Sequence, residues 1–180
     1  SAQRVDAFHI NGQFSCMLSG IGFDAKVAHD FDKQSKRGLM KYIQLTLQNI
    51  TSIKTYPFTI SSPEVNLELD AYFISIANSN QFGNQFTIAP KASLQDGLLD
   101  IVAVEKANLL ALITRVIWHI RFGTFTTDFA KRNGITYFQS KELTITNKEN
   151  APLHIDGDGK EGATAFHIKV IPSAYSLLMP

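Results

Sequence analysis

The sequence has little of several features that would each point to a class of protein. Cys16 is its single cysteine, so neither an internal disulfide nor a zinc site built from thiolates can form. Its 17 basic and 16 acidic side chains give a formal charge of +1, which provides no broad basic face for a phosphate backbone. We therefore expect no nucleic-acid partner, and a reducing cytoplasm fits the cysteine content best.

Long hydrophobic runs are also absent. The longest apolar stretch, residues 107–120, is interrupted by polar side chains and is well short of the ~20 residues that a membrane-spanning helix needs. The first residues lack the basic and apolar segments of a signal peptide. We expect no bilayer-crossing segment in this sequence.

The sequence does contain enough apolar material for a core. A length of 180 residues with 44% hydrophobic side chains fits one domain spanning residues 1–180. Asn11-Gly12 between two short apolar runs predicts an opening hairpin. Strand-like composition and alternation predict further strands over 57–60, 65–69, 71–76, 98–104, 135–138, 142–146, 152–155 and 165–171.

Two segments have helical periodicity instead. After Ala25, helix formers continue through Asn49, with apolar residues at helical spacing: Leu39, Ile43, Leu47 and Ile50. Residues 107–122 place apolar side chains on one wide face, and Gly123 suits the end of that helix. The predicted fold class is mainly β: an antiparallel β-sandwich or barrel with two attached α-helices.

The segment Gly20-Ile-Gly22-Phe-Asp24-Ala25 matches a loose dinucleotide-binding pattern after a predicted strand. However, no acid that could bind a ribose follows at the required distance, and alternating strand and helix units are missing. We interpret the glycines as a turn that lets a strand approach a helix closely. Asp24 would cap that helix or face a site.

Two acidic turns occur at strand ends, where loops often carry metal or proton chemistry: residues 93–98 and Asp156-Gly157-Asp158. Asp96 beside turn carbonyls is sufficient for Mg²⁺, although an ordinary turn has the same composition. The second turn is not an EF-hand, because Lys160 and Glu161 stand where that loop needs Asp or Asn and then Gly. It is a hairpin turn or an exposed acid acting as a base, and spacing alone favours the turn.

Other polar features leave two interpretations open. The loop over residues 78–86 could contact a polar ligand head group or be an ordinary loop. A cationic run over residues 33–41 is a solvated face or a contact for anionic lipid head groups, and the solvated face is favoured. The histidines are scattered and predict no metal pair: His9, His29, His119, His154 and His167.

Taken in order, several pieces resemble the C-terminal domain of the diacylglycerol kinase-like lipid kinases, the bacterial and sphingosine-kinase-related group. The matching pieces are residues 14–25, 78–86, 88–100, 156–158 and 170–180. The resemblance runs nearly end to end and is most specific from Ile88 to Asp100.

The resemblance implies a two-domain kinase. In that family an N-terminal α/β domain binds ATP through a Gly-Gly-Asp-Gly-Thr loop, and a C-terminal β-sandwich completes the cleft. No such loop occurs in this sequence. The chain is therefore expected to be the second domain alone, inactive without the N-terminal kinase domain.

The resemblance also assigns roles to individual residues. It implies a Mg²⁺ site at the Asp96 carboxylate and the main-chain oxygens of Ser93 and Leu98, and it implies that Asp158 is the proton acceptor. The family more often has Glu at that position, so the shorter Asp requires a closer backbone or an intervening water. Asp156 would orient the turn or the nucleotide side of the cleft.

The implied reaction is attack of a lipid hydroxyl, of a diacylglycerol- or sphingosine-like substrate, on the γ-phosphate of ATP. The implied setting is phospholipid biosynthesis at the inner membrane surface by a cytoplasmic protein that contacts the membrane transiently. Two alternatives stay open: an NAD kinase-like enzyme and a non-catalytic β-sandwich module that binds a ligand. The particular lipid and a homodimeric state are not determined, and both acidic turns are expected on one rim of the sandwich.

Overall fold

The computed structural model describes residues 2–32, 45, 48–49, 53–80, 89, 91–106 and 134–178. The expected helix over residues 107–122 lies outside these ranges, as do most apolar positions of the helical segment that precedes residue 50. The described elements are the helix α1 (Phe23–Asp32) and the strands β1 (Ala2–Ile10), β2 (Gln13–Ser15), β3 (Leu18–Gly22), β4 (Tyr56–Ser61), β5 (Asn66–Ala77), β6 (Leu99–Glu105), β7 (Ile135–Ser140), β8 (Glu142–Asn147), β9 (Leu153–Ile155), β10 (Asp158–Lys160) and β11 (Ala165–Leu178).

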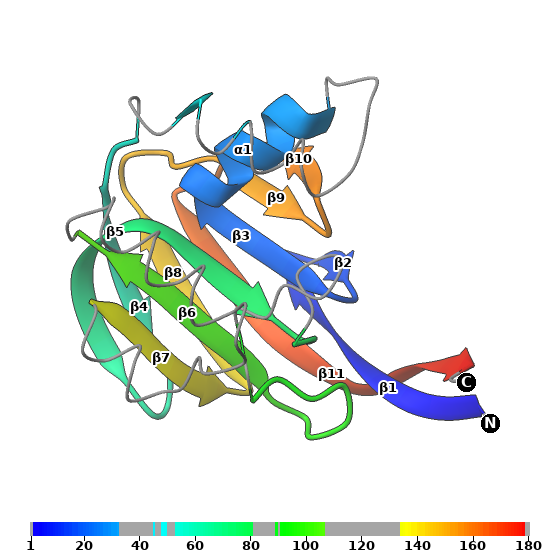
Figure 1. Ribbon diagram of the computed structural model, residues 1–180. Helices are drawn as coiled ribbons and strands as arrows, with labels where there is room; N and C mark the ends of the chain where they lie inside the picture. Colours follow the sequence, from blue (N-terminus) through cyan, green and yellow to red (C-terminus); the bar gives the residue numbers. More distant parts are fainter. Residues whose placement is uncertain are drawn as a thin grey trace.

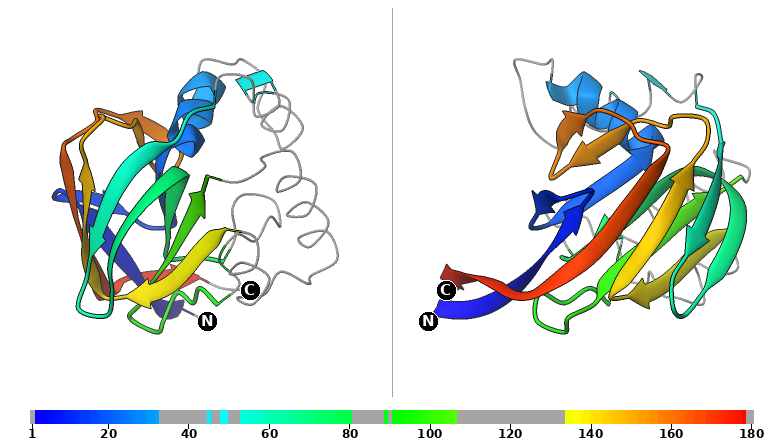
Figure 2. Two further views of the ribbon diagram at one scale, coloured as in Figure 1. Left: turned by 90° about the vertical axis from the view of Figure 1, so that its left-hand side faces the viewer. Right: turned by 180° about the vertical axis from the view of Figure 1, so that it is seen from behind.

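These strands form a single curled antiparallel sheet. Its order is β10-β9-β3-β5-β4-β8-β11-β1-β2, and a branch leads from β5 through β6 to β7. The sheet bends so far that β6 and β7 face β8 and β11 across the interior, which gives the shape of a sandwich or half-barrel (Figures 1 and 2). The predicted mainly-β antiparallel class is confirmed.

The core fills the inside of this curl. Fully buried side chains come from strands all around it, including Phe8, Ile60, Ile74, Ile101 and Phe166. The other face of β5, β6 and β7 is apolar too, with a second cluster that contains Ala77, Val102, Val104 and Ile135. Because both faces of β6 are covered, its sequence is a nearly continuous apolar run rather than an alternating one.

Local sequence signals account for the opening of the fold. Asn11 and Gly12 have φ values of 49° and 78°, the left-handed conformation that a two-residue hairpin turn requires, and β1 pairs with β2 across them. Gly22 ends β3 with φ of 102°, and α1 follows directly. The interpretation of the glycine segment as a tight strand-to-helix turn is confirmed.

Two strands continue well beyond their predicted ends. The break expected at Asp70 is wrong, because β5 continues through it and pairs Asp70 with Pro57 of β4. The Asp70 side chain is on the exposed face of the sheet, where a charge does not interrupt the ladder. β11 likewise continues past Ile171, through a shift in register opposite Asp6, and pairs with β1 as far as Leu178.

Within the described residues, no helix is both long and apolar enough to cross a membrane.

Candidate functional site

The Asp156–Asp158 turn joins two short strands, β9 and β10, at one end of the sheet. β9 pairs with β3, and β10, beside α1, pairs with β9 as the last of the described strands in the order (Figure 1). Asp156 has φ of 50° and Gly157 has φ of 92°, so the chain reverses in two residues. The sequence prediction of a hairpin turn here is confirmed.

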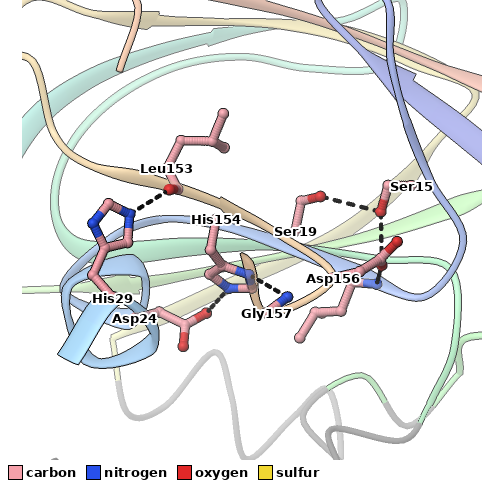
Figure 3. Close-up of polar contacts among 9 residues, drawn as sticks. Ser15, Ser19, Asp24, His29, Leu153, His154, Asp156 and Gly157 are labelled. Carbon is pink, nitrogen blue, oxygen red and sulfur yellow. Dashed lines mark hydrogen bonds and ion pairs between the residues drawn. The ribbon is translucent and has the colours of Figure 1, made fainter. Parts of the chain in front are cut away.

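The Asp156 carboxylate is held by the turn between β2 and β3. Its Oδ1 accepts hydrogen bonds from the Ser15 hydroxyl at 2.9 Å, the Met17 N–H at 2.9 Å and the Leu18 N–H at 3.0 Å. Its Oδ2 accepts the Cys16 N–H at 2.9 Å. Figure 3 shows Asp156 reaching toward Ser15 from the end of β9. The carboxylate therefore ties the β9–β10 turn to a second turn from the start of the chain.

These contacts alter the acidity of Asp156. Burial favours the neutral acid, but the backbone N–H groups of Cys16, Leu18 and Met17 stabilise the anion more strongly, so the pKa lies below its ordinary value. The charge also affects its neighbour. Burial, together with the nearby Asp156 anion, raises the pKa of the Cys16 thiol, which disfavours the thiolate.

Asp158, the predicted proton acceptor, begins β10 with its side chain 74% exposed. Its Oδ2 lies 3.8 Å from Lys160 Nζ, a solvent-exposed ion pair. Behind the strand, Gly159 packs on His29 of α1, because a Cβ atom at Gly159 would lie 2.6 Å from two atoms of that ring. The His29 Nε2 also donates to the Leu153 carbonyl at 2.9 Å, so α1 supports both strands of the hairpin.

A buried pair that the sequence analysis missed lies under the same turn. His154 of β9 is 1% exposed and Asp24 of α1 is 6% exposed, and His154 Nε2 lies 3.0 Å from Asp24 Oδ2. His154 Nδ1 accepts the Gly157 N–H at 3.2 Å (Figure 3). The two residues are 130 positions apart in sequence, so no spacing pattern could have paired them.

The second acidic turn, residues 93–98, is organised by short-range contacts. Asp96 Oδ1 accepts the Leu98 N–H at 3.0 Å, and Ser93 Oγ accepts the Gln95 N–H at 3.3 Å. Ser93 and Asp96 are exposed, and Leu98 is half-buried. Three of the predicted site residues therefore do belong to one turn.

A buried carboxylate that the sequence analysis did not single out, Asp6 of β1, attaches this turn to the sheet. Asp6 is 3% exposed; its Oδ2 accepts the Gly97 N–H at 2.8 Å and its Oδ1 accepts the Ser173 N–H at 2.7 Å. Its own N–H donates to the Leu94 carbonyl at 2.7 Å. Asp6 stands where the register of β1 and β11 shifts, so the irregularity in the strands frees its side chain to bind backbone N–H groups.

Asp100 lies on the other side of the same turn and is fully buried in β6. It accepts hydrogen bonds from the Tyr137 hydroxyl and from Gln139 Nε2, and the Tyr137 oxygen accepts the Lys91 N–H at 3.3 Å. Burial, which outweighs these hydrogen bonds, raises the pKa of the Asp100 carboxyl. Burial and the hydrogen bond to Asp100 raise the pKa of Tyr137. The pair fixes the segment that leads into the acidic turn.

Asn78 links the two turns through the interior. Its side-chain amide donates to the Asp6 carbonyl at 2.8 Å and to the Cys16 carbonyl at 2.9 Å, and its N–H donates to the Met17 carbonyl at 2.9 Å. A chain of hydrogen bonds therefore runs from Asp156 through residues 16–17, Asn78 and Asp6 to Gly97.

In Figure 1 both turns lie on the same side of the molecule, but they are separate from each other. Figure 1 shows the order of the segments down the right-hand side of the view. The tip of β9 and β10 comes first, and it is followed by β2, the end of β5 and the green segment over residues 91–98. The hydrogen bonds that connect the two turns pass through Asn78 and Asp6 rather than directly from one turn to the other. The edge therefore carries two separate acidic positions.

The chemistry of the 93–98 turn suits a hard cation. It combines an exposed carboxylate, Asp96, with main-chain oxygens, and water has access to complete an octahedron. In the described parts of the chain, no three His, Cys, Asp or Glu side chains gather where they could hold a metal ion. A site here would therefore depend on Asp96, carbonyl groups and water, a set that fits Mg²⁺ better than a transition metal.

The sequence matches the family described as "YegS C-terminal NAD kinase beta sandwich-like domain" over residues 18–179. The match covers most of the chain, and the chain belongs to this family.

Individual relatives agree with this assignment. A Bacillus subtilis (strain 168) protein named "Putative lipid kinase YtlR" is 29% identical over 163 residues, which cover 86% of this chain and 51% of that protein. A Yersinia pestis (strain Pestoides F) protein named "Probable lipid kinase YegS-like" is 24% identical over 183 residues, covering 99% of this chain and 58% of that protein. The chain thus spans about half the length of these relatives.

Among solved structures, one titled "Crystal structure of a putative diacylglycerol kinase from Bacillus anthracis str. Sterne" superposes with a TM-score of 0.73 at 20% identity. The match covers 98% of this chain and 56% of that one. At this identity the likeness establishes the fold.

Proposed function

We propose that this chain is the C-terminal domain of an ATP-dependent lipid kinase that transfers the γ-phosphate of ATP to a lipid hydroxyl. The observation that carries the proposal is the family match over residues 18–179, combined with an exposed carboxylate, Asp158, on a firmly held turn. The relatives named lipid kinases are about twice as long as this chain, which supports a separate N-terminal domain that binds ATP. The 180-residue chain alone is expected to be inactive.

In this proposal Asp158 accepts the proton of the attacking lipid hydroxyl. Phosphoryl transfer has a loose transition state that needs positioning and charge neutralisation more than a strong base. An exposed carboxylate can serve, because proton loss can come late in such a reaction. Lys160 Nζ, 3.8 Å from Asp158 Oδ2, places a positive charge beside this carboxylate.

Asp156 has a different role from its neighbour. Of the two roles that the resemblance implied, orienting the turn is supported by its hydrogen bonds to residues 15–18 of the same domain. Those donors occupy both carboxylate oxygens. Contact with the nucleotide side of the cleft stays a prediction.

Asp96, Ser93 and Leu98 would hold Mg²⁺ through the Asp96 carboxylate and the two main-chain oxygens. When bound, the ion would supply positive charge that orders the turn or neutralises phosphate oxygens. Asp6 and Asn78 would connect that turn to the strand turn beneath Asp158.

The substrate class, a diacylglycerol- or sphingosine-like lipid, places the protein at the inner membrane surface during turnover and in phospholipid metabolism. A cytoplasmic protein that visits the membrane transiently is consistent with the near-neutral charge and with the single cysteine. A homodimer of the full-length protein could use the same site in each subunit.

The test is a phosphoryl-transfer assay on the full-length protein encoded by the native gene. Labelled ATP and Mg²⁺ are supplied with a panel of diacylglycerol, sphingosine and monoacylglycerol in mixed micelles, and NAD is included as an acceptor. We expect a lipid product, and we expect Asp158→Asn to lower the turnover by about 10²–10⁴-fold, the usual contribution of a general base. Asp70→Asn removes an exposed carboxylate from β5 and is the matched control.

Retention of full activity by Asp158→Asn would remove that residue from its proposed role. Phosphorylation of NAD and not of lipid would replace the lipid kinase with an NAD kinase-like enzyme, the alternative to which the family description also refers. Binding of lipid without any phosphoryl transfer would identify a non-catalytic binding module.

A further inference from the structure

The two hydrogen bonds of the His154 imidazole select one tautomer of the ring. Its Nδ1 accepts the Gly157 N–H at 3.2 Å, and only an unprotonated ring nitrogen can accept. The single ring proton must then be on Nε2, which donates to Asp24 Oδ2 at 3.0 Å. The two contacts therefore fix the orientation of the ring and its tautomer from both sides.

Three elements hold this ring in place. His154 is on β9, Asp24 is in the first turn of α1, and Gly20 of β3 leaves the space between them. A Cβ atom on Gly20 would lie 2.3 Å from Asp24 Oδ2 and 2.5 Å from His154 Nε2, so only glycine admits the pair. His154 itself is 1% exposed, so solvent does not compete for its hydrogen bonds.

The ring holds the residue that immediately precedes Asp158. Gly157 has φ of 92°, and its N–H points back to His154. Asp156 fixes the same turn from the other side by binding the N–H groups of Cys16, Met17 and Leu18. With both anchors in place, the direction in which the chain leaves the turn at Asp158 is set.

We propose that His154, oriented by Asp24, is a positioning residue that places the Asp158 carboxylate through the Gly157 N–H. The inference rests on the proposed function of Asp158. His154 does not touch substrate in this proposal. It acts through the backbone, so its loss alters the turnover number more than the Michaelis constants.

Two substitutions at this position separate the two hydrogen bonds of the ring. His154→Asn brings an amide oxygen near the place of Nδ1, where it can accept the Gly157 N–H. His154→Gln brings an amide N–H near the place of Nε2, where it can donate to Asp24 but cannot hold Gly157 in the same way. The matched controls are His167→Asn and His167→Gln, since His167 is exposed on β11 and its Nδ1 lies 3.2 Å from Thr144 Oγ1.

The measurement is kcat and KM for ATP and lipid in the full-length protein. We expect His154→Gln to lower kcat by about 10–100-fold, the size of effect that a misplacement near ~1 Å produces, with KM nearly unchanged. His154→Asn is expected to retain kcat within about 3-fold, because it keeps the Gly157 contact. Equal losses in both variants, or no loss in either, would overturn the assignment.

A second readout is independent of kinase activity. In ¹⁵N-labelled full-length protein, the His154 ring should carry its proton on Nε2, and the Gly157 amide should exchange with solvent faster in His154→Gln than in His154→Asn. A ring protonated on Nδ1, or equal exchange in the two variants, would contradict the positioning role. A wild-type protein without kinase activity would remove the proposed function, and the tautomer and exchange rates would still decide whether His154 holds the turn.

Discussion

At the scale of single residues, the aspartates of this domain have the same side chain but differ in burial and in hydrogen-bond partners. Asp6 and Asp156 bind backbone N–H groups of distant turns, Asp100 is buried against Tyr137, and Asp96 and Asp158 are exposed. The first two therefore build the edge of the sheet. The exposed ones remain available for a cation or a substrate.

Asp156→Asn should destabilise the domain in a pH-dependent way. The folded pKa of Asp156 lies below its unfolded value, so the charged group stabilises the fold above the unfolded pKa of ~3.9. This contribution is lost as pH falls through the folded pKa. We expect the variant to lose about 1–2 kcal/mol of unfolding free energy at neutral pH, a modest value because the turn is partly exposed to solvent.

Urea unfolding of the 180-residue chain at neutral pH and at a series of values below about 4 measures this effect. The difference between wild type and Asp156→Asn should shrink as the solution becomes more acidic. Asp70→Asn, which changes an exposed carboxylate in β5, is the control and should not show a comparable loss of stability. A constant difference at all pH values would mean that the charge of Asp156 is not what matters.

The sequence alone predicted the importance of some of these aspartates and not of others. Asp96, Asp156 and Asp158 could be found because acid and glycine together at a strand end form a local pattern. Asp6 could not, and Asp24 was predicted only to cap its helix or face a site, because the partners of these two residues lie 91 and 130 positions away. His154 looked like one of several scattered histidines, and only the fold shows that it lies under the turn.

At the scale of elements, the junction of β3 and α1 depends on a close backbone approach. A Cβ atom on Gly22 would lie 2.6 Å from the Tyr72 carbonyl oxygen in β5, and Gly22 has φ of 102°. Gly12, in the hairpin between β1 and β2, also has a positive φ, 78°, but open space around it. Comparing substitutions at these two glycines therefore distinguishes the cost of backbone strain, which both share, from the cost of steric overlap, which only Gly22 has.

Gly22→Ala should therefore cost more stability than Gly12→Ala. Both substitutions impose the strain of a left-handed residue, about 1 kcal/mol, and Gly22→Ala adds an overlap with backbone that costs about 1–3 kcal/mol more. Thermal or urea unfolding of the two variants side by side measures the difference. Equal losses would mean that β3 and β5 can separate slightly without cost.

Element boundaries were predictable where turn chemistry was strong and not where the sheet decided them. Asn11-Gly12 fixed the first hairpin, and the acidic glycine turns fixed the start of β6 and the end of β9. Asp70 misled the prediction because a charged residue in a strand is acceptable when its side chain points outward. The extension of β11 to Leu178 depends on pairing with β1, which periodicity in one segment does not reveal.

At the scale of the whole molecule, the paired strands β1 and β11 run from the core to the two ends of the described chain (Figure 1). The inner pairs, from Ala7 with Ile171 to Ile10 with Ile168, lie on the buried core. The outer pairs, from Ala2 with Leu178 to Arg4 with Ser176, form an exposed ribbon that projects from the body. Asp6 marks the point where one half changes to the other.

The outer ribbon should exchange its amide hydrogens much faster than the inner one. An isolated two-stranded ribbon is marginally stable in water, whereas the inner pairs can open only with the core. Hydrogen exchange of the 180-residue chain should show at least about 10²-fold faster exchange for residues 2–4 and 176–178 than for residues 7–10 and 168–171. The pairs of β4 with β5 provide an internal reference, and uniform protection along β1 would contradict this expectation.

The adjacency of Ala2 and Leu178 also determines how the domain would respond to mechanical load. A force applied through these two positions would open the antiparallel ribbon like a zipper, breaking its hydrogen bonds one after another instead of shearing them together. The first firm resistance would come at Asp6, whose carboxylate binds Ser173 across the ribbon. The first few pairs would therefore separate at low force, and the opening would stop at the hydrogen bond between Asp6 and Ser173.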